Sequence, residues 1–114
     1  MRPARRPGEF VFVSVAGDPP AGVTPEATVR EDEGLTLVLR REDADAHGLA
    51  YDFVAAWLSL EVHSALDAVG LTAAFSATLT EAGISCNVLA GRFHDHVLVP
   101  VERADDALAL LGPR

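Results

Sequence analysis

One stretch in the second half of the chain decides the fold, Gly70-Leu-Thr-Ala-Ala-Phe-Ser-Ala-Thr-Leu-Thr-Glu-Ala-Gly-Ile84. Its large apolar residues, Leu71, Phe75 and Leu79, recur at helical spacing, with threonine and serine on the opposite side. Gly83 is the kind of residue that ends a helix in the left-handed conformation. The stretch therefore predicts an amphipathic helix that packs one face on a core.

Strand patterns flank this helix on both sides. Residues 53–62 before it are strand-like, and residues 84–90 after it predict another strand. A turn over residues 91–94 leads to a partner strand over residues 95–99. Pro100 then opens a last helix, where its missing N–H costs nothing. The second half of the chain is thus predicted to form a βαββα unit.

The first half is richer in hairpins than in helices. Phe10–Val15 has the β-branched and aromatic content of a buried strand. Ala27–Glu31 and Leu35–Arg40 predict a hairpin with Gly34 in its turn. Arg41–His47 predicts one short helical turn. The whole pattern indicates an α+β fold, an antiparallel sheet with helices packed on one face.

Composition narrows the class of protein. The chain has 114 residues, a hydrophobic fraction of 49% and a charged fraction of 23%, which fit one compact globular domain. Its net charge of −8 argues against a nucleic-acid partner. No lysine occurs, so Schiff-base and P-loop lysine chemistry are excluded.

Other features bear on location. No apolar run approaches the length of a membrane span. The single cysteine, Cys86, fits a reducing compartment, so a cytoplasmic protein is expected. Residues 1–8 are predicted to form a flexible, frayed basic tail. The charged runs Glu31–Glu33 and Arg41–Asp45 are predicted to be solvated turns.

Three segments carry a family resemblance: Leu66-Asp-Ala-Val-Gly-Leu71, Gly83-Ile-Ser-Cys-Asn-Val88, and His94-Asp-His96 followed by Val-Pro100. The run Asp67–Leu71, followed by Phe75 and Leu79-Thr-Glu-Ala-Gly-Ile84, resembles the signature of ACT domains. The three segments are similar to a more specific group, a family of small uncharacterised bacterial ACT-domain proteins related to the ACT units of the arginine sensors called CASTOR. The resemblance covers nearly the whole chain and is looser in the first half.

The resemblance implies a ferredoxin-like ACT architecture with two ACT-like units that share one compact domain. Residues 9–56 would form a degenerate N-terminal unit that lacks a clear first helix, and residues 57–114 the C-terminal unit. It also implies a non-catalytic regulatory or sensor module that dimerises and binds an amino acid at the loop between the first strand and first helix.

The residues around that loop suit a small zwitterion. Gly70 lies near the first turn of the helix, where free N–H groups attract a carboxylate. Asp67 could pair with an ammonium group, and Ser64 could add a hydroxyl contact. Alternatively, Asp67 or Ser64 only caps the helix and Gly70 only relieves crowding. The expected ligand-binding residues are Ser64, Leu66, Asp67, Val69, Gly70, Leu71, Asn87, His94 and His96.

The turn before the last strand offers a second wall for the pocket. His94 and His96 would share one strand face, a spacing that can also ligate a metal. No third ligand is evident, so neither a metal nor a cofactor is expected. Asn87 either faces a pocket or occupies an exposed position. Cys86 is expected to be a small core residue rather than a nucleophile.

Three hypotheses follow. The first is an amino-acid-binding regulatory module with a homodimeric assembly. The second is a structural homodimerisation module without a ligand. The third is an enzyme that uses His94, His96 or Cys86, and it has no recognisable series of nucleophile, base and orienting residue.

Overall fold

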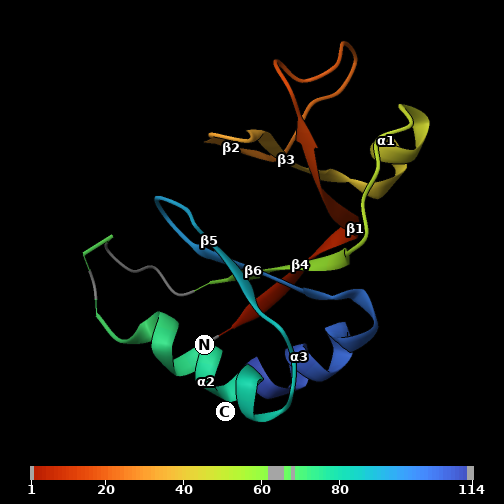
Figure 1. The fold of residues 1–114 in the computed structure, drawn as a ribbon. Helices are drawn as coiled ribbons and strands as arrows, with labels where there is room; N and C mark the ends of the chain where they lie inside the picture. The colour runs from red at the N-terminus through yellow and green to blue at the C-terminus, as the bar shows by residue number, and fades with distance from the viewer. Residues whose placement is uncertain (1, 62–65, 68, 113–114) are drawn as a thin grey trace. The chain divides into compact units, whose positions relative to one another are not determined.

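The computed structural model describes residues 2–61, 66–67 and 69–112 (Figure 1). Its elements follow the order β1 (Pro3–Val15), β2 (Ala27–Glu31), β3 (Gly34–Arg40), α1 (Arg41–Ala46), β4 (Val54–Leu60), α2 (Leu71–Glu81), β5 (Asn87–Ala90), β6 (Asp95–Pro100), the 3₁₀ turn η1 (Val101–Arg103) and α3 (Ala104–Leu111). The hydrogen-bonded strand order is β2-β3-β1-β4-β6-β5. The predicted α+β class is confirmed. In the described part of the chain no helix is long and apolar enough to cross a bilayer.

The chain divides into two compact units. Gly8–Ala55 forms the N-terminal unit, and Met1–Pro7 together with Ala56–Arg114 forms the C-terminal unit. Strand β1 is shared, because its first residues belong to one unit and its remaining residues to the other.

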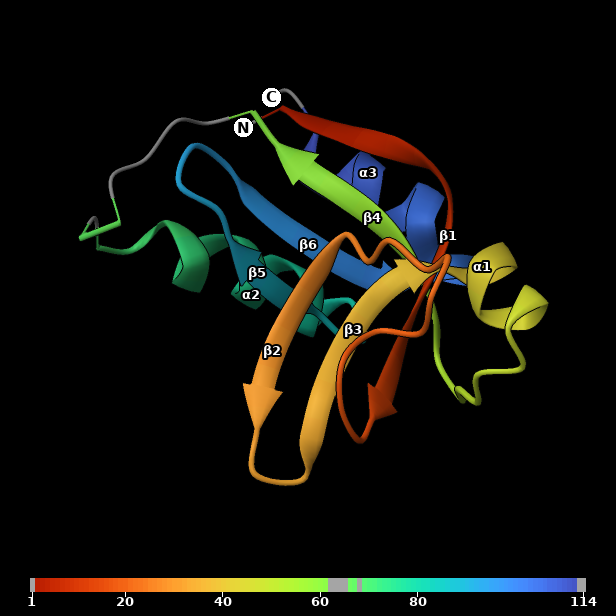
Figure 2. The same cartoon turned by 90° about the horizontal axis from the view of Figure 1, so that it is seen from above.

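The N-terminal unit is an antiparallel sheet in which β3 lies between β2 and the second part of β1. Strand β1 pairs with β3 from Phe10 opposite Arg40, and β2 pairs with β3 in the hairpin that Figure 2 shows. The predicted hairpin and helical turn are confirmed. The core of this unit consists of Val11, Val13, Val23, Leu37, Leu39 and Ala44. Its one helix, α1, contributes a single buried residue, so this core is built almost entirely from strands and a loop.

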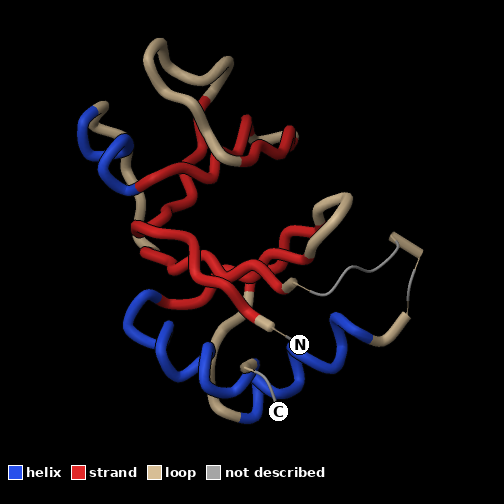
Figure 3. Tube along the Cα trace, turned by 180° about the vertical axis from the view of Figure 1, so that it is seen from behind, coloured by secondary structure: helices blue, strands red, loops and turns tan. Residues whose placement is uncertain are grey.

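The C-terminal unit places two helices on one face of its strands. Figure 3 shows α2 and α3 on the same side of β4, β6 and β5. Phe75 and Leu79 of α2 pack with Leu58 and Leu60 of β4 in one hydrophobic core. The predicted helical periodicity is confirmed, since Phe75 is 1% and Leu79 0% exposed.

The end of α2 explains why the next strand is shorter than predicted. The Ile84 N–H donates to the Leu79 carbonyl at 2.9 Å, and the Gly83 N–H donates to the Thr80 carbonyl at 2.9 Å. With Gly83 at φ 71°, these bonds form a Schellman motif. Because Ile84 is committed to this cap, β5 begins only at Asn87 rather than at residue 84.

The prediction of a frayed basic tail over residues 1–8 is wrong for residues 3–8. Strand β1 already begins at Pro3, and the Glu61 N–H donates to the Arg2 carbonyl at 2.8 Å. The pairing partner lies more than fifty residues away in sequence, so no local pattern announces it. Gly8, at φ 94°, stands where β1 passes from one unit to the other.

The last helix differs from the prediction in its details. Pro100 ends β6, and a 3₁₀ turn separates it from α3. The buried residues of α3 are Ala104, Ala107 and Leu111.

Candidate functional site

The start of α2 has an open backbone. Gly70 is the N-cap residue, with φ 100°, and no side-chain cap hydrogen bond is formed there. Its carbonyl accepts the Ala74 N–H at 3.0 Å. A Cβ at this position would meet no described atom within 4 Å, so crowding does not explain the glycine. The first N–H groups of the helix therefore have no acceptor within it.

Charge sets this helix start apart from those of the other two α-helices. Glu42 and Asp43 lie in the first turn of α1, and Asp105 and Asp106 in that of α3. The first turn of α2 carries no acidic residue. Because the N-terminus of a helix carries partial positive charge, acidic side chains normally neutralise it. The partial positive charge at the N-terminus of α2 is not neutralised by any acidic side chain of its own first turn.

The loop before α2 presents apolar side chains at the surface. Leu66 is 68% and Val69 98% exposed, and Asp67 is exposed as well. Leu71 packs partly against the core. Ser64 lies outside the described residues. Exposed aliphatic side chains beside open N–H groups are suited to contact with a ligand or a partner.

His96 belongs to a different cluster, on the strand face opposite the helices. Trp57 and Ser59 alternate along β4 with core residues, so they point away from α2 and α3. The Trp57 Nε1–H donates to His96 Nδ1 at 3.2 Å, and Ser59 Oγ lies 2.9 Å from the same nitrogen. The guanidinium of Arg6 lies 4.0 Å from the centre of the Trp57 ring.

This environment favours a neutral imidazole. Indole N–H is only a donor, so Nδ1 of His96 must be the acceptor and its proton is assigned to Nε2. Burial, followed by the positive charge of Arg6, lowers the pKa of His96. His94 lies in the turn before β6 and is exposed. Strand β6 begins at Asp95, so His94 precedes the strand and His96 lies within it.

The remaining candidates are simpler. Asn87 is the exposed first residue of β5, and its Nδ2 donates to the Leu98 carbonyl at the long distance of 3.5 Å. Cys86 packs against the core, and burial raises the pKa of its thiol. Among the residues that the structure describes, no group of three or more His, Cys, Asp or Glu could hold a metal ion.

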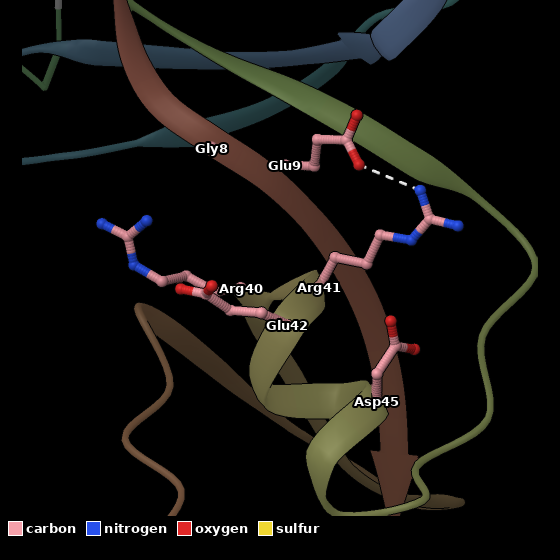
Figure 4. Close-up of a pocket in the computed structure, with 6 residues that line it drawn as sticks. All are labelled: Gly8, Glu9, Arg40, Arg41, Glu42 and Asp45. Carbon is pink, nitrogen blue, oxygen red and sulfur yellow. Dashed lines mark hydrogen bonds and ion pairs between the residues drawn. The ribbon is translucent and has the colours of Figure 1, made fainter.

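The N-terminal unit contains a cavity that the sequence patterns do not predict. It has a volume of about 360 Å³ and opens between β1 and α1 (Figure 4). Arg41 connects its walls, since Nη1 bonds Glu9 Oε1 at 2.9 Å and Nε donates to the Tyr51 hydroxyl at 2.9 Å. The Tyr51 hydroxyl donates in turn to Asp45 Oδ1 at 2.7 Å. The sequence predicts a solvated turn over Arg41–Asp45, and the partner of Arg41, Glu9, is too remote in sequence for that pattern to indicate it.

Comparison with known proteins supplies a family. Two family models described as ACT domain match the chain, one over residues 1–56 and one over residues 53–112. No curated protein matches.

Solved structures agree with the family models. A Vibrio cholerae protein of unknown function, described as a possible transport protein, is 48% identical, with a TM-score of 0.91 over 96% of this chain and 86% of that one. An Agrobacterium tumefaciens protein shares 20% identity, with a TM-score of 0.75 over 91% of this chain and 81% of that one. The ligand-free regulatory subunit of aspartate kinase from Thermus thermophilus shares 11% identity, with a TM-score of 0.68 over 96% of this chain and 92% of that one.

Proposed function

Since the chain belongs to the ACT-domain family, we propose that it is a non-catalytic regulatory module that binds a free amino acid at the start of α2. The ferredoxin-like ACT fold, with two tandem ACT units, supports a ligand-binding role. The similarity in fold to the regulatory subunit of an aspartate kinase is compatible with this role. The relationship to CASTOR-type arginine sensors is part of the proposal.

One observation carries the proposal, the uncompensated N-terminus of α2. Gly70 leaves the backbone accessible, and the first turn lacks both a capping side chain and an acidic residue. A ligand carboxylate would accept hydrogen bonds from the N–H groups of Leu71, Thr72 and Ala73 and would be favoured by the helix dipole. In a chain of net charge −8, such a local positive end is the natural place for a carboxylate.

Asp67 and Ser64 are proposed to contact the ammonium group of the ligand, and Leu66, Val69 and Leu71 its aliphatic part. Asn87, His94 and His96 are proposed as a second wall. We also propose that the protein forms a homodimer and is located in the cytoplasm.

A charge placed in the first turn of α2 tests the carboxylate site. Ala73 is exposed, so Ala73→Glu does not disturb the core. Its carboxylate would occupy the positive end of the helix and repel the ligand, so the affinity for amino acids in isothermal titration calorimetry should fall at least ~10-fold.

Ala77→Glu is the matched control. It introduces the same side chain at an exposed position one turn further along the same helix, beyond the reach of the first-turn N–H groups. This variant should bind like the wild type. Equal affinity in both variants, or no binding of any of the twenty amino acids to the wild type at millimolar concentration, would contradict the proposal.

A structural dimerisation module remains the second candidate, because apolar side chains stand exposed. Val29 on β2 is 47% and Phe93 59% exposed, in addition to Leu66 and Val69. Strand β2 is at one end of the strand order, and exposed edge strands are sites of chain pairing. Val29→Lys should convert a dimer to a monomer in light scattering if this edge pairs. Unchanged mass would exclude β2 as the interface.

A further inference from the structure

We propose that the N-terminal unit has a separate binding site for a small zwitterion, in the cavity between β1 and α1. The cavity is lined by Gly8, Glu9, Arg40, Arg41, Glu42 and Asp45 (Figure 4), all of them in the N-terminal unit. Its volume of about 360 Å³ is within the usual range for small-molecule sites. This site is distinct from the one proposed at Gly70 and does not depend on it.

The charged groups of the cavity are already held in place. Arg41 bonds Glu9 and Tyr51, and Tyr51 bonds Asp45, so side chains from β1, α1 and the segment before β4 are linked. The hydrogen bonds to Tyr51 and Glu9 raise the pKa of Arg41, so it stays charged. A ligand would meet an ordered arrangement, which lowers the entropic cost of binding.

The same groups keep unused hydrogen-bonding capacity. A guanidinium has five N–H donors, and the structure assigns two bonds to that of Arg41. Asp45 accepts one bond at Oδ1, which leaves Oδ2 available, and Glu42 has no hydrogen bond among the described residues. Arg41 can therefore donate hydrogen bonds to a ligand carboxylate, while Asp45 accepts them from an ammonium group.

The separation of these charges suits an α-amino acid. Arg41 Nε and Asp45 Oδ1 both bond the Tyr51 hydroxyl, so they are no further apart than the sum of those two short bonds. The carboxylate and the ammonium group of an amino acid are joined through a single carbon, so one ligand can reach both. Arg40 adds a second cation, and it approaches Gly8 so closely that a Cβ there would lie 2.9 Å from Arg40 Nη1.

The negative charge of the N-terminal unit favours a ligand that carries an ammonium group. Residues 8–55 contain ten Asp and Glu and three Arg, a formal charge of −7. Their field disfavours a ligand that brings only negative charge. A zwitterion should therefore bind, whereas its N-acetyl derivative, which lacks the cation, should not. The rival interpretation is a purely structural staple that ties α1 to β1.

Backbone amide NMR on the full chain separates these interpretations without any variant. The probes are the twenty free L-amino acids, added one at a time, followed by the N-acetyl and amide derivatives of any that bind. At least one should give saturable shifts at the amides of residues 9 and 41–45, and both derivatives should bind about tenfold more weakly. No saturable shift there, or shifts confined to residues 70–73, would overturn the inference.

A pair of isosteric variants adds a second readout. Asp45→Asn removes the cavity charge but keeps an acceptor for Tyr51, so the affinity should fall about tenfold. Asp43→Asn makes the same change on the same helix outside the cavity lining, and it should change the affinity less than about twofold. Equal losses in the two variants would show a general charge effect and would refute the site.

Discussion

The two units share a family but differ in where their charge and stability reside. The N-terminal unit has ten acidic residues and three arginines, whereas the rest of the chain has seven acidic and six basic ones. The helix α1 of the N-terminal unit has six residues, whereas the helices α2 and α3 of the C-terminal unit have eleven and eight. Two units of the same fold can therefore present two different kinds of polar group to a ligand. The C-terminal unit offers backbone N–H groups, and the N-terminal unit offers charged side chains.

Their cores differ in the same way. Five of the eleven core residues of the C-terminal unit come from helices, among them Phe75 and Leu79, whereas Ala44 is the only helical residue in the core of the N-terminal unit. Helix packing should therefore dominate the stability of one unit, and strand pairing that of the other. Single substitutions can test this contrast.

The largest effect is expected for Phe75→Ala, which empties a position that is 1% exposed. The free energy of unfolding of the C-terminal unit should fall by about 3–5 kcal/mol, because burial is lost and a cavity remains. Trp57 is the only tryptophan and Tyr51 the only tyrosine, and they lie in different units. In urea, the transition seen by Trp57 fluorescence should shift. A loss below about 1 kcal/mol would contradict the assignment of this core.

The N-terminal unit should be most sensitive to its hairpin. In Gly34→Ala the new Cβ would lie 2.6 Å from the Val15 carbonyl oxygen, and φ at Gly34 is 149°. Because the neighbour is backbone, the pairing of β1 with β3 must shift, at a cost of about 1–3 kcal/mol in the Tyr51-monitored transition. Gly17→Ala is the control, since no atom lies within 4 Å of its Cβ. Similar losses in both variants would rule out this mechanism.

A smaller gain is expected for Ala73→Glu. The new carboxylate at the N-terminus of α2 should raise the free energy of unfolding by about 0.3–1 kcal/mol in low salt, even as it weakens ligand binding. The gain should diminish at high salt because the field is screened. Ala77→Glu should not show it. A destabilised Ala73→Glu would mean that the start of α2 is already neutralised by another group.

The smallest effect concerns the pH dependence of the C-terminal unit. Burial and Arg6 lower the pKa of His96, so the unfolded chain binds a proton at a higher pH than the folded one. The stability that neutral His96 contributes to the folded state is then fully present above the ordinary pKa of histidine. It is lost progressively as the pH drops below that pKa. Urea midpoints should decline from about pH 7.5 to 5.5, less steeply in His96→Gln than in the wild type. The control is His47→Gln in the N-terminal unit, which should leave the pH dependence of this urea midpoint as in the wild type. An unchanged pH dependence in His96→Gln would show that His96 does not cause the decline.

Local patterns predicted most of the elements, and contacts remote in sequence account for the failures. The spacing of Leu71, Phe75 and Leu79 defined α2, and Gly34 defined the hairpin, because each signal lies within a few residues. The strand over Pro3–Gly8 was missed because three arginines in the first six residues indicate a solvated tail, and only the distant β4 provides its hydrogen bonds.

The candidate sites show the same division. Gly70 was predicted at the start of a helix from its position alone, and the structure places it there. The relay from Glu9 through Arg41 to Asp45 could not be predicted, because thirty-two residues separate Glu9 from Arg41. The interaction of His96 with Trp57 was missed for the same reason, since thirty-nine residues separate them.

Strand β1 has a consequence for how the chain is made. Its first residues precede the N-terminal unit in the chain, yet their partner, β4, is synthesised only when that unit is nearly complete. The first residues of β1 must therefore wait for β4 while the segment between the two strands is synthesised. Cutting the gene at the boundary near residue 55 would also separate the C-terminal unit from the residues that begin β1. A chain in which residues 1–7 are joined directly to residue 56, without residues 8–55, would be the way to produce that unit alone.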